Sequence, residues 1–166
     1  MEITYSFTEY DYPNLSQVLN DMGRRMVEYM REKLKENGTN ASGKLSSSIA
    51  HLVQQDGQAF EVSISLEEYW KYVEYGTKPH WVPVDKLREW IIVKPVIPEA
   101  RNGKLPTVDQ LAHMINWKIH EKGTQPQEFF WNSVEEAVAD FEAAVEEALG
   151  RDIDMQVEAL LLPLQF

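Results

Sequence analysis

Apolar residues between Asn14 and Glu36 recur at spacings of three and four, which is the period of one face of an α-helix. The stripe consists of Leu15, Val18, Leu19, Met22, Met26, Tyr29, Met30 and Leu34. Asn14 fits the N-cap of this helix, and Asn37-Gly38 fits its end. A helix of this length with one apolar face must bury that face against other elements, so we expect it to cover a core.

Two segments of alternating apolar residues follow, at Ser48 to Gln55 and Ala59 to Ser65. The Asp56-Gly57 pair between them predicts a β-hairpin, because both residues tolerate positive φ. The serine-rich stretch from Thr39 to Ser47 is expected to be a mobile loop. Its Gly-Lys pair lacks the earlier glycine and the preceding strand of a phosphate-binding P-loop.

Shorter helices separated by glycine and proline are predicted in the middle of the chain. Glu67 to Tyr75 favours a short helix, and Pro83 suits the first turn of the next one. Three prolines between Val93 and Pro106 indicate an extended segment. Thr107-x-x-Gln110 has the form of a capping box that opens a further helix, which Gly123 ends.

The last long helix is expected from Phe130 to Leu149, with an apolar face formed by Val134, Ala137, Val138, Phe141, Val145, Ala148 and Leu149. Alternation from Ile153 to Ala159 predicts a final strand. The fold class is therefore α+β, with long N- and C-terminal helices packed on a small antiparallel sheet of three or more strands. The 166 residues suit a single domain, 1–166, with an inserted helical segment at about 92–123 and a C-terminal tail at 150–166.

Composition excludes several classes of protein. The chain has no cysteine, which rules out disulfides and thiolate metal sites and fits a reducing cytoplasm. No apolar run approaches the roughly twenty residues of a membrane span, and the first residues do not resemble a signal peptide. The net charge of -11 argues against binding to a nucleic-acid duplex.

Acidic residues concentrate near the C-terminus. Seven acidic residues and no basic residue lie between Glu128 and Leu149. This run is either a solvated helix face, a surface that repels nucleic acid, or a surface that docks on a basic partner.

No set of residues predicts an active centre. His113 and His120 are seven positions apart, whereas helical zinc sites more usually place two histidines four apart with a third ligand nearby. His51 falls in a predicted strand, and the serines gather in the predicted loop. We therefore expect no enzyme, no cofactor and no metal. The best enzymatic alternative, a histidine-based hydrolase, would bind a divalent metal ion.

The stretch from Glu67 to Trp81 is rich in aromatic residues around a Gly-Thr turn. Glu74 lies just before Gly76, so its carboxylate is predicted to accept the amides of Thr77 and Lys78 and to lock the turn. This is a structural role rather than general-base catalysis.

The same stretch carries a resemblance to a known family. The string Tyr72, Val73, Glu74, Tyr75, Gly76 and Thr77, followed by Pro79 and His80, resembles the signature of the tail-completion or neck proteins of long-tailed double-stranded-DNA phages. Two further blocks match in the same order. They are Ser42, Gly43, Leu45, Ser48 and Ile49, then Gly123, Thr124, Pro126, Phe129 and Phe130. The resemblance spans about Leu15 to Leu149.

The resemblance implies a virion protein of the head–tail connector, assembled in the host cytoplasm into a closed ring of six-fold symmetry. Its partners would be neighbouring connector, tail-terminator or tail-tube proteins, without sequence-specific nucleic-acid binding and without a membrane. The candidate interface residues are Trp70, Trp81, Glu135, Glu136, Glu142 and Glu146, although three or more of the five tryptophans are expected in the core.

Two alternatives stay open. One is a tail terminator that caps the tail tube. The other, suggested by the acidic charge, is a host binding module or antitoxin-like partner.

Overall fold

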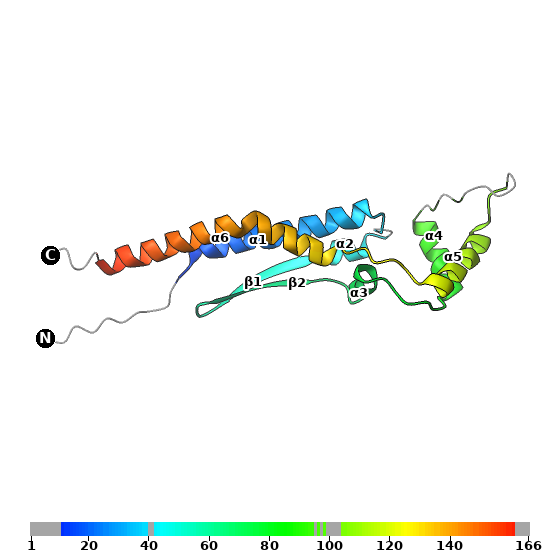
Figure 1. The fold of residues 1–166 in the computed structure, drawn as a ribbon, viewed down its shortest axis with the longest axis horizontal. Helices are drawn as coiled ribbons and strands as arrows, with labels where there is room; N and C mark the ends of the chain where they lie inside the picture. The colour runs from blue at the N-terminus through cyan, green and yellow to red at the C-terminus, as the bar shows by residue number, and fades with distance from the viewer. Residues whose placement is uncertain (1–10, 40–41, 95, 97, 99–103, 162–166) are drawn as a thin grey trace. The chain divides into compact units, whose positions relative to one another are not determined.

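The α+β class is confirmed in the computed structural model, which describes residues 11–39, 42–94, 96, 98 and 104–161 (Figure 1). The elements in this part of the chain are α1 (Pro13–Glu36), α2 (Lys44–Ser48), β1 (Ala50–Asp56), β2 (Ala59–Ser65), α3 (Trp70–Glu74), α4 (Val84–Val93), α5 (Val108–Lys122) and α6 (Phe130–Leu161).

The chain divides into two compact units. The first takes Met1–Tyr29, Ala50–Ser65 and Asn132–Phe166, and the second takes Met30–Ile49 and Leu66–Trp131. The prediction of a single domain stays a prediction.

The sheet of the first unit is a two-stranded hairpin. β1 and β2 pair antiparallel from Ala50 opposite Ser65 to Asp56 opposite Ala59. The two turn residues are therefore Gly57 and Gln58, one position later than predicted. Gly57 has φ 60°, the conformation that a type II′ hairpin turn requires at its first central residue.

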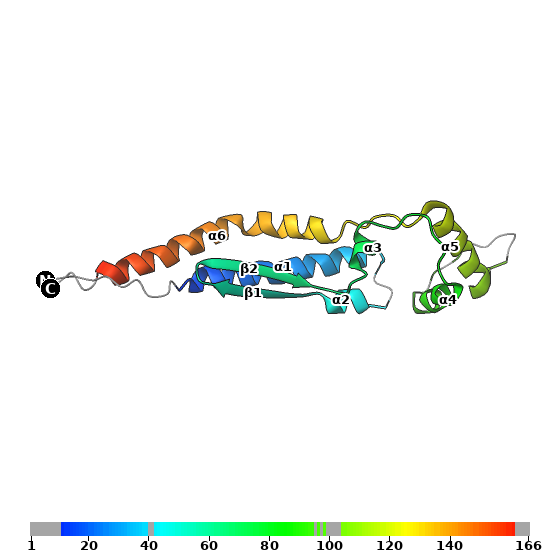
Figure 2. The ribbon, with the colours of Figure 1, turned by 90° about the horizontal axis from the view of Figure 1, so that it is seen from below.

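The long helices of the first unit lie alongside this hairpin (Figures 1 and 2). Gly23 of α1 faces β1 so closely that a Cβ atom there would lie 2.7 Å from the His51 ring. Tyr12, just before α1, meets Phe60 of β2 edge-on, with 6.1 Å between ring centroids. Glycine on the helix thus leaves room for the His51 side chain of β1.

The predicted C-terminal strand is wrong, because α6 continues to Leu161. The described part of the chain has only two strands, so the expected third strand is absent there. Residues 151–161 contain no proline or glycine and are rich in helix formers, which outweighs the alternation of Ile153, Met155, Val157 and Ala159. The single Gly150 does not interrupt the helix.

Asp152 of α6 caps α1, a role that the sequence assigned to Asn14. The buried carboxylate accepts the backbone amides of Asn14 at 3.1 Å and Leu15 at 2.8 Å, and the Asn14 side-chain amide at 2.6 Å. Burial raises the pKa of Asp152, but the hydrogen bonds from Leu15 and Asn14 outweigh it, so this pKa lies below its ordinary value. The prediction of Asn14 as N-cap is wrong, because α1 begins at Pro13.

In the second unit, α1 ends as predicted. Gly38 has φ 61°, and the amides of Gly38 and Thr39 bond to the carbonyls of Lys35 and Leu34, which is a Schellman motif. The mobile loop expected next is wrong in part, because Lys44–Ser48 form α2 with Leu45 buried.

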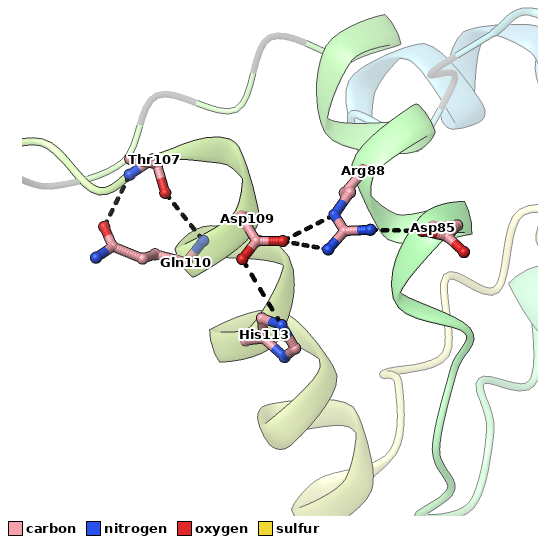
Figure 3. A network of polar contacts seen from close by, with 6 residues as sticks. All are labelled: Asp85, Arg88, Thr107, Asp109, Gln110 and His113. Carbon is pink, nitrogen blue, oxygen red and sulfur yellow. Dashed lines mark hydrogen bonds and ion pairs between the residues drawn. The ribbon is translucent and has the colours of Figure 1, made fainter.

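The α4–α5 pair of this unit has a small apolar core of Leu87, Ile91 and Ala112. The predicted capping box is confirmed. The Thr107 side chain accepts the Gln110 amide, and the Gln110 side chain accepts the Thr107 amide (Figure 3). Gly123, at φ 71°, ends α5 as predicted. The extended segment expected from Val93 to Pro106 lies largely outside the described residues.

Figure 3 also shows how α4 is joined to the first turn of α5. Arg88 of α4 donates to Asp109 of α5 and, at 2.5 Å, to Asp85 of its own helix. The Arg88 guanidinium lowers the pKa of Asp109. Because these side chains are exposed, the ion pairs fix orientation more than they add stability.

Candidate functional site

Two Gly-Thr pairs meet where the chain enters and leaves the α4–α5 segment. Gly76-Thr77 follows α3, and Gly123-Thr124 follows α5. The Thr77 amide donates to the Thr124 carbonyl at 3.2 Å, and the Thr124 amide donates to the Thr77 carbonyl at 3.1 Å. The two threonine hydroxyls are also hydrogen-bonded, at 3.0 Å. We call these four residues the Gly-Thr bridge.

The two paired connections of the Gly-Thr bridge enclose α4 as well as α5. We call the enclosed residues, 78–122, the inserted segment; the predicted bounds of about 92–123 stay a prediction. Figures 1 and 2 show the green and yellow connections running side by side at its base.

Both glycines of the bridge are required by its geometry. A Cβ atom on Gly76 would lie 2.2 Å from the Thr124 carbonyl oxygen, and one on Gly123 would lie 1.9 Å from the Thr77 carbonyl oxygen. Both residues also have positive φ, at 68° and 71°. No other residue type fits either position without moving a connection.

Glu74 accepts backbone amides, but not those that were predicted. Its side chain is 2% exposed, and its carboxylate accepts the amide of Phe130 at 2.8 Å and that of Trp131 at 3.4 Å. The predicted partners were Thr77 and Lys78, and the Thr77 amide is instead used in the Gly-Thr bridge. Glu74 therefore caps the N-terminus of α6, where a negative charge is favoured.

The rest of the signature is divided between interior and surface. Val73 is half-buried, while Tyr72, Tyr75, Pro79 and His80 are exposed. The Tyr75 hydroxyl accepts the indole N–H of Trp131 at 2.7 Å. Within the signature, the residues that make backbone contacts are therefore Glu74, Gly76 and Thr77. Its tyrosines, Pro79 and His80 are exposed to solvent.

A groove of about 570 Å³ adjoins the signature. Its lining is mainly apolar and comes from the signature, α4 and α5, with Val73, Val82, Leu87, Trp90, Ile115 and Ile119 among the residues. Lys86 and Lys94 also line it. Lys94 donates to the Gly38 carbonyl and Lys86 pairs with Glu89, so both cations have partners within the chain.

The expectation that three or more tryptophans fill the core is wrong, since none of the five is buried. Trp70 is half-buried against Phe130, with 4.6 Å between ring centroids. Trp81, Trp90, Trp117 and Trp131 are exposed. The buried apolar side chains are all smaller than an indole, and Phe129 is the largest of those that are fully buried.

Three aromatic rings gather on the surface of the inserted segment. Trp81 stacks on His120, with 3.8 Å between centroids and 11° between planes. Trp117 meets Trp81 edge-on at 5.9 Å. Trp81 is 56% and Trp117 63% exposed. We call Trp81, Trp117 and His120 the tryptophan patch. Its signal in the sequence is the pairing of Trp117 and His120 on one side of a helix.

The histidines do not form a metal site in the described part of the chain, where no group of three or more histidine or acidic side chains is placed to hold an ion. His113 lies 3.9 Å from Asp109, while His120 is covered by Trp81. His80 interacts with the Lys78 carbonyl at 2.8 Å. Each of these three histidines therefore has a separate local environment.

The acidic residues predicted as an interface all lie on the surface of α6. Glu135, Glu136, Glu142 and Glu146 are exposed. Asp140 instead accepts the Tyr29 hydroxyl at 2.5 Å, and that hydrogen bond raises the pKa of Tyr29. Asp140 and Asp152 of α6 are thus hydrogen-bonded to α1, whereas the four glutamates predicted as an interface are exposed.

Charge is unequally divided between the inserted segment and α6. Residues 78–122 contain eight lysines and arginines and five acidic residues, while α6 contains nine acidic residues and one arginine. The inserted segment is therefore net basic in a chain whose total charge is -11.

None of the helices that the structure describes is long and apolar enough to cross a membrane. Comparison of the chain with known protein families, with curated proteins and with solved structures finds no match.

Proposed function

We propose that this chain is a structural, non-enzymatic subunit of a tailed-phage particle, which forms part of the head–tail connector as a tail-completion ring. In this proposal it is assembled in the host cytoplasm and incorporated into the neck of the virion. The observation that carries the proposal is the meeting of two sequence blocks on which the family resemblance rests.

These blocks lie about 50 residues apart in the chain and interact through backbone groups. Thr77 of the signature pairs reciprocally with Thr124 of the later block. Glu74 of the signature caps the helix that begins at Phe130 of that block. A motif whose members depend on each other for folding supports a shared fold with the resembling family, rather than a chance match of short strings.

The hydrogen bonds of the Glu74 carboxylate support a structural role rather than a catalytic one. A general base must reach a substrate proton, and it is usually exposed to a cleft. The Glu74 carboxylate is buried and already accepts two backbone amides. Its work is to hold the start of α6.

The exposed tryptophans support a role in assembly. Tryptophan is enriched at the centres of protein interfaces, where it contributes more binding energy than other residues. Four exposed tryptophans in a chain of this size are more than a monomer needs. A ring subunit would use such residues in the contacts with its neighbours and with the adjoining rings.

Deletion of the gene from the phage or prophage that carries it tests this proposal. We expect DNA-filled heads and complete tails that fail to join, with joining restored by the wild-type chain supplied from a plasmid. Gold-labelled antibody against the chain should mark the head–tail junction in electron micrographs of virions. Label at the end of free tails would favour the tail terminator instead. Normal virions without the gene would refute a structural role and favour the host binding module.

A further inference from the structure

Two surfaces of this chain are complementary in charge and in apolar character. The first is the tryptophan patch on the net basic inserted segment. The second is one side of α6, which consists of Glu135, Val138, Glu142, Glu146, Leu149 and Ile153 at spacings of three and four. All six are exposed, and we call this set the α6 outer face.

We propose that the tryptophan patch of one copy of this chain binds the α6 outer face of a second copy. The proposal deepens the function proposed above and rests on it, because it names the surfaces through which neighbouring subunits of the ring would meet. The contact is head-to-tail, so that each copy offers one surface to each of two neighbours.

The tryptophan patch has the composition of an interface centre. Its two indoles lie in edge-to-face contact and stay more than half exposed, which is an unfavourable arrangement in water. Met114, exposed one turn before Trp117 on α5, extends the apolar surface. Such a group of large exposed side chains is typical of a binding site that a partner covers.

The charges beside the patch are mostly basic. Lys78 and His80 lie within three residues of Trp81, and Lys118 follows Trp117; all three side chains are exposed. Glu121, one turn after Trp117, is the acidic neighbour. A partner with apolar side chains set among carboxylates would therefore match both the rings and most of their rim.

The α6 outer face is such a partner. Val138, Leu149 and Ile153 supply apolar contacts along the helix, with Glu135, Glu142 and Glu146 between them. None of these three carboxylates has an ion pair or hydrogen bond within the residues that the structure describes. The opposite edge of α6 is different, because Glu147 pairs with Arg151 there.

The charge balance favours this pairing over the other two contacts that copies could make. Two chains of charge -11 repel each other unless surfaces of opposite sign meet. Contact between two tryptophan patches would place basic rims together, and contact between two α6 outer faces would place six glutamates together. Only the contact between the tryptophan patch and the α6 outer face brings opposite charges together. A pair of chains joined in this way still has one unused tryptophan patch and one unused α6 outer face.

Complementation between two variants of the full chain tests the proposal. Trp81→Ala/Trp117→Ala disables the patch, and Glu142→Lys/Glu146→Lys disables the α6 outer face. We expect the wild-type chain to associate in sedimentation velocity at low salt and at concentrations up to about 500 μM, and to dissociate as salt is added. Each variant alone should associate at least about tenfold more weakly.

An equimolar mixture of the two variants should form a discrete heterodimer, because one intact surface remains on each. Glu147→Lys/Asp154→Lys changes the net charge by the same amount on the other edge of α6 and should leave association unchanged. Circular dichroism must show that every variant keeps its helix content. Glu142→Gln/Glu146→Gln, which avoids introducing positive charge, replaces the lysine variant if that one unfolds.

Wild-type chain that stays monomeric throughout this range would overturn the inference. So would a patch variant that associates as strongly as the wild type, an α6 variant without effect, or a mixture that does not form the heterodimer. The two proposals fail separately. Heads and tails that need the chain in order to join, together with no self-association, would overturn only this inference. Self-association as described, in a phage whose heads and tails join without the gene, would overturn only the proposed function.

Discussion

Replacing Glu74 by alanine removes the only acidic group that caps the N-terminus of α6 among the described contacts. The carboxylate makes one short hydrogen bond, 2.8 Å to the Phe130 amide, and one long one, 3.4 Å to the Trp131 amide. We count the short bond at its full value and the long one as a minor addition. A hydrogen bond to a charged group contributes about 1.5–3 kcal/mol, and loss of an N-cap alone costs about 0.5–2 kcal/mol.

These two estimates describe the same interaction, so they are not added. Because Glu74 is 2% exposed, alanine also leaves the Phe130 amide without a partner in a site closed to water. We therefore expect Glu74→Ala to lower the free energy of unfolding by about 2–3 kcal/mol. For a chain of this length, that corresponds to a fall in Tm of about 5–10 °C.

Urea denaturation followed by circular dichroism measures this difference. Glu68→Ala is the matched control, since Glu68 is an exposed acidic residue just ahead of α3 and its replacement should change stability by less than about 0.5 kcal/mol. Glu74→Gln should fall between the two, because it keeps one acceptor oxygen but loses the charge. A loss below about 0.5 kcal/mol for Glu74→Ala would refute the capping role derived from the structure.

Four further substitutions test the backbone and the caps. Gly123→Ala should lower the free energy of unfolding by about 3 kcal/mol or more, because of the positive φ and the clash with Thr77. Gly150 lies inside α6 with open space around it, so Gly150→Ala should raise the free energy of unfolding by about 0.5–1 kcal/mol. Urea denaturation measures both changes. Thr107→Ala should remove about 1 kcal/mol by opening the capping box of α5, and equal stability would contradict that role. Asp152 has a lowered pKa when folded, so its contribution is present above the unfolded value of about 4 and is lost as pH falls below it. The difference in free energy of unfolding between wild type and Asp152→Asn should therefore become smaller as the pH is lowered. A difference that does not change with pH would show that the ionisation of Asp152 does not contribute to stability.

Features determined by neighbouring residues were predictable from the sequence. The Thr107–Gln110 capping box and the glycine ends of α1 and α5 each depend on contacts within five residues. The hairpin was also predicted, although its turn is displaced by one residue because Asp56 pairs with Ala59 at the end of the ladder.

Features determined by residues far apart in the chain were not predictable from the sequence. Glu74 was correctly assigned to bind backbone amides, but its partners are 56 and 57 positions away, and nothing local distinguishes them from Thr77 and Lys78. Asp152 likewise caps a helix that begins more than 130 residues earlier. In the tail, alternation over a few residues predicts a strand, but the helix propensity of the same residues continues α6 to Leu161. The exposed tryptophans could not be distinguished from core residues by type alone.

The Gly-Thr bridge has a consequence for how chains of this kind can diverge. Because the backbone leaves and returns through two paired residues, the ends of the inserted segment are held at a fixed short separation. The entropic cost of closing a loop between two such fixed ends rises only slowly with the length of the loop. Segments of different size and surface could therefore replace residues 78–122 without altering the hydrogen bonds of Thr77 and Thr124. Specificity for neighbouring proteins could then change when the inserted segment is exchanged, while the sequence of the remaining chain stays under the same structural constraints.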